Sequence, residues 1–383
     1  MQTSVSIIGA GNCGCAFAAD LADRGANVLL YAHPEHRRHA ETIERNGYLE
    51  AGMKIEGRFH PKVSSDMADV VRFSKFIVIT VPSYGHDSIL SELAKFDLSR
   101  HVVISITGNF FALMARRQIN AQYLLETATA PYASRMQDGK VTVMGIKSVM
   151  PIAAMPVDVD DDLRDEIGAI FPMPLEWRSN VLEIGMSCIT GVIHPTPALM
   201  NTGWIETRKG DFYFYREGMS ASVARVIGQV DQERMAIARE FGFKPQSVVA
   251  IMNSYYSRDF ADFGEFARET VEHNTTKMAP THMRDRFIVQ DVPYVLVPWF
   301  ELGAKVGLHC TAIKSIIDLA SIVNDTDYLA TGRNLRRLGL DAASKGQVIE
   351  TFSAPIAASI APSIAAPIAP SIAPWADELR RIA

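Results

Sequence analysis

The chain is poor in cysteine, and its four cysteines lack the paired spacing of a structural metal site. Cys13 and Cys15 stand two positions apart, while Cys188 and Cys310 lie far from them and from each other. A four-ligand zinc site needs a second closely spaced pair, so no metal site is predicted. The pattern favours unpaired thiols in a reducing compartment, and we expect a cytoplasmic protein.

An excess of positive charge is also missing. Lysine and arginine together number 38, against 43 aspartates and glutamates, which gives a formal net charge of -5. No stretch interleaves basic with aromatic residues, so a nucleic-acid partner is not expected. With 48% hydrophobic and 21% charged residues among 383, the composition is typical of a folded protein of two ordinary domains.

A hydrophobic run suited to a membrane is absent as well. The start, MQTSVSIIGAG, lacks the basic segment and apolar core of a signal peptide and predicts a strand instead. The uncharged stretch 351–376 has the length of a membrane span. It contains five prolines, however, and each costs a helix about 3 kcal/mol. Neither a signal peptide nor a membrane partner is therefore predicted.

The same stretch carries a short repeat. Isoleucine recurs every four residues from Ile356 to Ile372, each time followed by alanine. This spacing, with prolines inside it, fits neither a strand nor a helix. Residues 346–383 are therefore predicted to form an extended or disordered tail. A solvated appendage is favoured over a docking arm.

Strands and helices alternate in the N-terminal half. Residues 3–9 are an apolar run that ends in glycine, 12–24 have helical spacing, and 26–32 form a second apolar run. Further predicted strands cover 76–82, 101–108 and 141–149. This order predicts an α/β fold, a Rossmann-type doubly wound parallel sheet over residues 1–180.

The pattern of the C-terminal half is helical. The stretches 219–241 and 299–324 carry apolar residues at intervals of three and four, and no strand-like run of comparable strength interrupts them. We predict a mostly α-helical C-terminal domain over residues 181–345. Within it, Asp231 stands three residues before Arg234, which predicts a structural ion pair on one helix.

A glycine-rich hexapeptide joins the first predicted strand to the first predicted helix. Gly9, Gly11 and Gly14 match G-x-G-x-x-G, with Ala10 and Asn12 between them. In this context the first glycine allows a tight turn and the second lets a pyrophosphate approach the backbone. The third lets helix and strand pack closely, and the free N–H groups of the helix start bind phosphate. These five residues are predicted to bind a dinucleotide.

The end of the second strand bears on the choice between NAD and NADP. An NAD site usually has an acidic residue there, whereas this chain has Ala32, flanked by Tyr31 and His33. Arg37 follows, and an arginine at this place can bind the additional phosphate of NADP. The prediction is therefore NADP. Glu35 keeps NAD as the alternative, and a solvated arginine at the next helix start is the alternative for Arg37.

Several segments, taken in order, resemble the opine dehydrogenases, in particular the octopine synthases of plant-tumour plasmids and the bacterial carboxyethyl-norvaline dehydrogenase. The resemblance runs from about residue 4 to 340, and it is most specific in HP-x-P and R-[FY]-x-x-x-D-V. Besides the glycine motif, the segments are FIVITVPSYGHDSILSELAKFDLS at 76–99, ETATAPYASR at 126–135, GVIHPTPALMN at 191–201, FYREGM at 214–219, VDQER at 230–234 and RFIVQDVPYVLVPWFELG at 286–303.

The resemblance implies a reductive condensation of an amino acid with a 2-oxo acid such as pyruvate. The imine that they form takes hydride from the nicotinamide and becomes an N-(carboxyalkyl) amino acid. The resemblance also implies that His194 is the catalytic histidine and Asp291 its partner. A histidine can donate and accept protons near neutrality, and a carboxylate fixes its tautomer. Arg286 is implied to reach the cofactor pyrophosphate, and Glu126 and Arg135 to border the substrate pocket.

Two other functions stay open at this point. The same scaffold would support reduction of a 2-oxo acid or ketone to an alcohol, and a non-enzymatic dinucleotide sensor would use the fold without the chemistry. His194 and Asp291 weigh against the sensor. The sequence leaves undetermined the amino acid, the oxo acid, the physiological direction and whether the chain forms a homo-oligomer.

Overall fold

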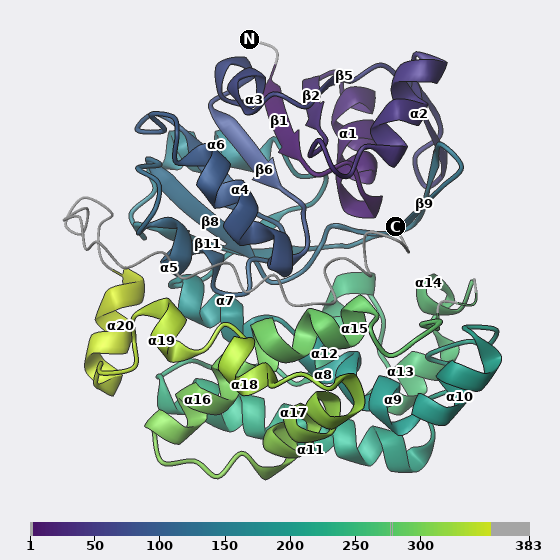
Figure 1. The fold of residues 1–383 in the computed structure, drawn as a ribbon, viewed down its shortest axis with the longest axis vertical. Helices are drawn as coiled ribbons and strands as arrows, with labels where there is room; N and C mark the ends of the chain where they lie inside the picture. The colour runs from purple at the N-terminus through teal and green to yellow at the C-terminus, as the bar shows by residue number, and fades with distance from the viewer. Residues whose placement is uncertain (1–2, 276, 278, 354–383) are drawn as a thin grey trace.

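The computed structural model describes residues 3–275, 277 and 279–353. Within them the chain divides into a sheet part, residues 3–177, and a helical part, residues 181–353. In Figure 1 the sheet part lies above the helical part, and α7 (Val181–Ser187) starts the second where the two meet. Every strand among the described residues belongs to the sheet part.

An eight-stranded sheet forms the centre of the sheet part. Its neighbouring strands are parallel, except that β11 pairs antiparallel with β8. This arrangement confirms the predicted Rossmann-type fold. In spatial order the strands are β12 (Leu175–Trp177), β11 (Met150–Met155), β8 (Tyr123–Thr127), β7 (Val102–Ser105), β6 (Phe76–Ile79), β1 (Ser4–Ile8), β2 (Asn27–Tyr31) and β5 (Lys62–Ser64).

The side chains on the two faces of this sheet belong to two different apolar cores. Successive side chains of a strand point to opposite faces, so Ile104 of β7 belongs to the same apolar core as Phe17 of α1. Its neighbour Val103 joins the other core, which continues without a break into the helical part as far as Trp299. The sheet therefore shares one apolar core with the helical part. The helices of the sheet part are α1 (Asn12–Asp23), α2 (Arg38–Asn46), α3 (Met67–Phe73), η1 (Ser83–Gly85), α4 (His86–Leu93), α5 (Phe111–Ala115) and α6 (Asp161–Gly168).

A second, four-stranded sheet was not predicted. It packs on α1, and its strands in spatial order are β4 (Gly57–Phe59), β3 (Leu49–Met53), β10 (Lys140–Ile146) and β9 (Tyr132–Gln137). The strand predicted at 141–149 is therefore β10 of this sheet, and the central sheet takes β11 instead. The apolar run 141–155 holds both strands, and its pattern cannot show where one sheet ends and the other begins.

The helical part confirms the predicted helical pattern. The stretch 299–324 holds parts of two helices, because Gly307 between them has φ +78, a left-handed conformation that ends a helix. From α8 to the end, the elements are α8 (Thr190–Ile193), α9 (Pro195–Met200), α10 (Thr202–Arg208), α11 (Ala221–Glu240), α12 (Val248–Tyr256), α13 (Phe263–Glu269), α14 (Val271–Asn274), α15 (Arg286–Val289), the π-helical η2 (Val292–Leu296), α16 (Val297–Lys305), α17 (Thr311–Asn324), α18 (Tyr328–Thr331), α19 (Leu335–Leu338) and α20 (Lys345–Ser353).

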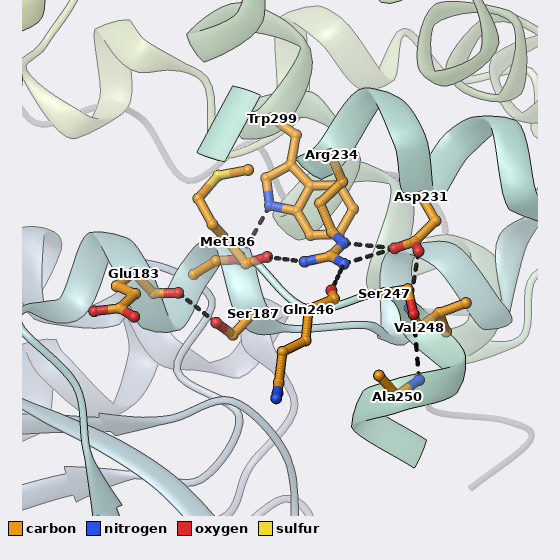
Figure 2. Close-up of polar contacts among 11 residues, drawn as sticks. Glu183, Met186, Ser187, Asp231, Arg234, Gln246, Ser247, Val248, Ala250 and Trp299 are labelled. Carbon is orange, nitrogen blue, oxygen red and sulfur yellow. Dashed lines mark hydrogen bonds and ion pairs between the residues drawn. The ribbon is translucent and has the colours of Figure 1, made fainter. Parts of the chain in front are cut away.

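The predicted ion pair on α11 is present and buried (Figure 2). Arg234 donates from Nε and Nη2 to Asp231 Oδ1, at 2.8 and 2.7 Å. Its other bonds go to the carbonyl oxygens of Met186 and Gln246, at 2.7 and 2.6 Å, while Asp231 Oδ2 accepts from Val248 N. The pair thus holds α7, α11 and α12 together.

The boundary of the predicted tail needs a correction. Residues 345–353 form α20, and its Val348 and Phe352 are completely buried. These two residues are four apart and lie on one helical face, whereas the proline repeat begins only at Pro355. The remaining tail, 354–383, lies outside the described residues. In the part of the chain that the structure describes, no helix combines the length and apolar character that crossing a membrane requires.

Candidate active site

The glycine motif forms a turn that only glycine can make. Gly9 has φ +120, and a Cβ there would lie 2.7 Å from Thr80 Oγ1. A Cβ on Gly14 would lie 1.8 Å from the carbonyl oxygen of Gly9, so strand and helix could not pack. On Gly11 a Cβ would meet nothing within 4 Å. The backbone is therefore open at the position predicted to receive a pyrophosphate, and the cradle fits that group.

Gly11 also caps α1 without a side-chain hydrogen bond, which leaves the first N–H groups of the helix for an anion. Asn12 has a second use. Its Oδ1 accepts from Met136 N at 2.8 Å, and its carbonyl oxygen accepts from Ser134 Oγ at 3.1 Å. Asn12 ties the motif to β9, so the side chain is engaged inside the protein. Ala10 is buried and contributes only backbone.

Arg37 stands close to the end of β2, at the start of α2. Its Nη2 lies 2.7 Å from Glu44 Oε2, and its Nη1 contacts Ser65 Oγ. Ala32 directly after β2 is buried. No carboxylate takes the usual place of the NAD-binding acidic residue, and the guanidinium that could bind a phosphate is held by Glu44.

His194 and Asp291 form a hydrogen bond of 2.6 Å between Nδ1 and Oδ2. His194 ends α8, and the following Pro195 starts α9, so the imidazole projects from a break between two helices. Asp291 precedes the π-helical turn η2, a feature that is frequent at functional sites. The imidazole also stacks on Phe287, with ring centres 4.1 Å apart and planes 16° apart.

The geometry fixes how this pair can act. A carboxylate accepts, so Nδ1 donates to Asp291 and Nε2 is left as the reactive nitrogen. Nε2 has no hydrogen-bond partner among the described residues, and the His194 side chain keeps 11% of its surface exposed against 2% for Asp291. An imidazole with one nitrogen anchored and the other free can donate and accept a proton at a substrate.

Arg286 begins α15 next to Phe287, whose ring stacks on His194, and Arg135 belongs to β9. Both are exposed, and among the described residues neither side chain makes a hydrogen bond or ion pair. Partial desolvation, and then the charge of Arg286, lowers the pKa of Arg135, while the charge of Asp285 opposes this shift. The charge of Arg286 also acts on Cys13 of the glycine motif, so β9 and α15 bring two cations to the neighbourhood of the cradle. Their predicted contacts with anions stay predictions.

Glu126 does not border a substrate pocket as predicted. It is completely buried on β8, where Oε2 accepts from Phe110 N at 3.0 Å and Oε1 from Ala112 N at 2.7 Å. Both oxygens are thus bonded to the N-terminus of α5, and burial raises the pKa of the carboxyl to about 7. A segment that resembles a pocket wall cannot reveal which of its side chains turn inward.

A buried lysine beside the site was missed. Lys147, between β10 and β11, is 8% exposed, and its Nζ donates to the carbonyl oxygen of Ala130 at 2.6 Å. The ammonium lies 5.2 Å from the ring centre of Tyr255 and 5.9 Å from that of Tyr256. One signal was present in the sequence, since Lys147 is the single charged residue of 141–157.

His273 of α14 links this lysine to His194. Burial lowers the pKa of His273 to about 3, and the charges of Lys147 and His194 act in the same direction. Its Nε2 is sealed from solvent without a partner among the described residues. The rings of Tyr215 and Tyr256 lie 5.1 and 5.3 Å from it. A neutral imidazole thus stands within electrostatic range of both Lys147 and His194.

The chain is similar to known proteins over most of its length. Residues 177–324 match the model of the alpha-helical domain of NAD/NADP octopine/nopaline dehydrogenases, and residues 4–109 match that of coenzyme F420-dependent NADP oxidoreductases. The vitopine synthase of Allorhizobium ampelinum is 30% identical over 361 residues, which are 92% of this chain and 99% of the relative. The opine dehydrogenase of an Arthrobacter species is 30% identical over 346 residues, 88% of this chain and 94% of its own.

The chain belongs to the opine dehydrogenase family. Membership makes it an NAD(P)-dependent oxidoreductase, so the sensor alternative is set aside. Among solved structures, an octopine dehydrogenase in complex with NADH and agmatine has a TM-score of 0.70 at 17% identity, covering 92% of this chain and 98% of that one. This likeness confirms the order of a Rossmann-type sheet followed by a helical domain in the enzyme.

Proposed function

We propose that the enzyme condenses an L-amino acid with a 2-oxo acid such as pyruvate and reduces the product with NADPH, and that His194 is its acid–base residue. The observation that carries the assignment of His194 is the 2.6 Å bond from its Nδ1 to Asp291 Oδ2. The two named relatives, a vitopine synthase and an opine dehydrogenase, support the reaction class.

The reaction needs a proton at two places. The amine nitrogen attacks the carbonyl carbon of the oxo acid, and the carbonyl oxygen leaves as water after it receives protons. The nitrogen of the resulting imine must carry a proton before the adjacent carbon accepts hydride. His194 Nε2 delivers and removes these protons, while Asp291 stabilises the charged ring. Bound NADPH supplies the hydride.

The cofactor is held by the glycine motif, Gly9 to Gly14, at the start of α1. Arg37 favours NADPH over NADH because its guanidinium leaves Glu44 and binds the additional phosphate instead. Arg286 and Arg135 take anionic groups of cofactor and substrates. We place the reaction in the cytoplasm, where the four free thiols of the enzyme stay reduced.

Amine dependence tests this function. We expect no loss of NADPH absorbance with pyruvate alone and a steady loss when the correct L-amino acid from a panel of the common ones is added. Oxidation by pyruvate without any amine would instead assign the runner-up, a 2-oxo acid reductase. His194→Gln should lower kcat by about 10²–10⁴ with NADPH binding unchanged. The exposed His309→Gln is the control and should keep full activity.

A further inference from the structure

Lys147 is a buried cation without an anion. An ammonium has three N–H donors, yet Nζ makes one hydrogen bond, to the carbonyl oxygen of Ala130. No ion pair neutralises it among the described residues, and only 8% of the residue is exposed. A buried charge is strongly unfavourable unless it is paired. The position therefore calls for an anion from outside the chain.

The immediate surroundings stabilise the ammonium without cancelling its charge. The faces of Tyr255 and Tyr256 give cation–π contacts, worth about 0.5–2 kcal/mol each. Both tyrosines belong to α12 of the helical part, whereas Lys147 follows β10 of the sheet part. A backbone bond from Ser148 N to Tyr255 O, 2.8 Å long, holds the two parts together here. The charge of Lys147 thus stands where the sheet part and the helical part meet.

Two neighbours place the lysine relative to the chemistry. On one side, burial raises the pKa of Cys13 in the glycine motif, and the charge of Lys147 opposes this rise. On the other side, burial lowers the pKa of His273, and the charges of Lys147 and His194 lower it further. His273 Nε2 is a second polar atom that is sealed and unpartnered.

The hydrogen bonds and ring contacts agree: Lys147 Nζ donates to the carbonyl oxygen of Ala130, two residues before β9, and β9 bonds the glycine motif through Ser134. On the other side the Tyr256 ring contacts both the ammonium and His273, and the rings of Tyr215, Phe214 and Phe287 continue from His273 to His194.

We propose that Lys147 Nζ binds the carboxylate of a substrate, with His273 beside it as a neutral hydrogen-bonding neighbour, and so selects anionic substrates. This inference rests on the proposed function, in which both the 2-oxo acid and the amino acid carry a carboxylate. A charge-assisted hydrogen bond of this kind is worth about 1.5–3 kcal/mol, which is about 10- to 100-fold in affinity.

The free enzyme should lose this affinity in alkaline solution. Burial lowers the pKa of Lys147 from 10.5 to about 8. Below that value the ammonium is charged and binds a carboxylate, and above it the amine is neutral and the attraction is lost. Arginine stays charged throughout this range, so Lys147→Arg should remove the alkaline loss. A merely structural lysine would produce no such pH profile in ligand binding.

The test is a calorimetric titration of the enzyme–NADP⁺ complex with pyruvate and, separately, with the L-amino acid that supports turnover. Pyruvate is not oxidised by NADP⁺ in this reaction, so binding is measured without catalysis. Lys147→Met should lower the binding affinity for one of the two ligands, pyruvate or the amino acid, at least about 10-fold. The control is Lys140→Met at the start of β10, the strand that precedes Lys147; its side chain is 48% exposed, and the variant should bind as the wild type does.

Further arms separate the sources of the anion. If the amino acid supplies the carboxylate, wild type should prefer it to its decarboxylated amine, and Lys147→Met should lose that preference. If pyruvate supplies it, the preference should persist while pyruvate binding weakens. Weaker NADP⁺ binding with unchanged substrate affinities would assign the lysine to the cofactor phosphates and overturn the proposal. Unchanged affinity for all ligands would overturn it too.

Failure of this inference is distinct from failure of the proposed function. Amine-dependent turnover in wild type with unaltered binding in Lys147→Met refutes the role of the lysine alone. Pyruvate binding without amine-dependent turnover refutes the reaction and leaves the comparison of variants intact, while no carboxylate binding by wild type refutes both. Removing an unpaired buried charge should leave Lys147→Met at least as stable as wild type in thermal unfolding. Should it fail to fold, the pH profile of Lys147→Arg decides.

Discussion

At His194, one hydrogen bond and one ring contact set the direction of the imidazole. Asp291 fixes the nitrogen that donates, and Phe287 fixes the plane of the ring. Asp291 Oδ1 is buried without a partner among the described residues, so one oxygen of the carboxylate bonds the histidine and the other has no hydrogen bond from that part of the chain. In the proposed reaction the ring is therefore oriented before any substrate arrives, which lowers the entropic cost of reaching a reactive geometry.

Arg37 should control the choice of cofactor. Arg37→Ala removes a charge-assisted contact worth about 1.5–3 kcal/mol to the phosphate that distinguishes NADPH. We expect its dissociation constant for NADPH to rise about 10- to 100-fold while that for NADH changes little, as measured by fluorescence titration. Glu44→Gln should have the opposite effect, because Glu44 competes for the guanidinium at 2.7 Å.

Arg45→Ala, in the last turn of the same helix and exposed, is the matched control for Arg37. It should leave both dissociation constants as they are. Equal losses of NADPH and NADH in Arg37→Ala would contradict the assignment to the phosphate.

Among the elements, the loop between β7 and α5 is the most constrained. Thr107, Asn109 and Phe110 all have positive φ, at 58, 50 and 66°, a region that non-glycine residues enter only at a cost in energy. The loop follows the C-terminal end of β7, the edge where sheets of this type bind their ligands. Glu126 holds it through Phe110 N and Ala112 N.

The carboxyl of Glu126 should make stability depend on pH. Its folded pKa is raised by burial from 4.5 to about 7, so the folded state holds a proton that the unfolded state releases. Its contribution is complete below about pH 4.5 and disappears as the pH rises through 7. The shift corresponds to about 3 kcal/mol. In urea unfolding, wild type should lose about this much stability between pH 4.5 and 7 relative to Glu126→Gln.

The exposed Glu56→Gln provides the comparison, and its pH dependence should match that of wild type. Parallel curves for wild type and Glu126→Gln would show that the carboxyl does not titrate in this range.

How far the sequence predicts an element depends on the distance to its partners. The unit from β1 to β2 lies within residues 4–31, and its predicted bounds were correct to within one residue. The second sheet was missed because β3 pairs with β10, far along the chain, and its edge strand β4 is only three residues long. Pairings of this kind leave no periodic trace in either segment.

For the whole molecule, Arg333 joins the helical part to the sheet part. It is completely buried between α18 and α19, and its Nη1 donates to the carbonyl oxygens of Gly108 and Asn109 at 3.3 and 2.5 Å. Its Nη2 lies 3.2 Å from His86 Nδ1. Burial, and then the charge of Arg333, lowers the pKa of His86 well below its ordinary value, so the imidazole is neutral and accepts.

Removing this guanidinium should loosen the molecule as a unit. Arg333→Met removes the donor to two buried acceptors, the carbonyl oxygen of Asn109 and His86 Nδ1, at about 1–3 kcal/mol each, so we expect the free energy of unfolding to fall by about 2–5 kcal/mol. Equilibrium urea unfolding measures it. Arg333→Lys should recover only part of the loss, since an ammonium lacks the planar fork of the guanidinium.

Arg336→Met, three residues later and exposed, should change stability by less than about 0.5 kcal/mol. A loss in Arg333→Met no larger than in this control would mean that the buried bonds contribute nothing.

The site was predictable where residues carry a pattern or a resemblance, and not elsewhere. The tight turn of the glycine motif and the contact between His194 and Asp291 were predicted in this way, while their roles stay predictions. Lys147 was missed because its burial depends on tyrosines more than a hundred positions away, and its own segment carries only the signal of one charge in an apolar run. Glu126 was assigned to the wrong surroundings because a resemblance gives a position along a strand, not the face to which the side chain turns.

The place of Arg333 in the chain has a consequence for synthesis. Translation proceeds from the N-terminus, so the ribosome makes the loop at Gly108 225 residues before the arginine that secures it. The first strand and helix, which flank the glycine motif, are made early, while the loop after β7 lacks Arg333 until the last helices emerge. An unfinished polypeptide therefore contains this first unit without the bonds that join the loop to the helical part.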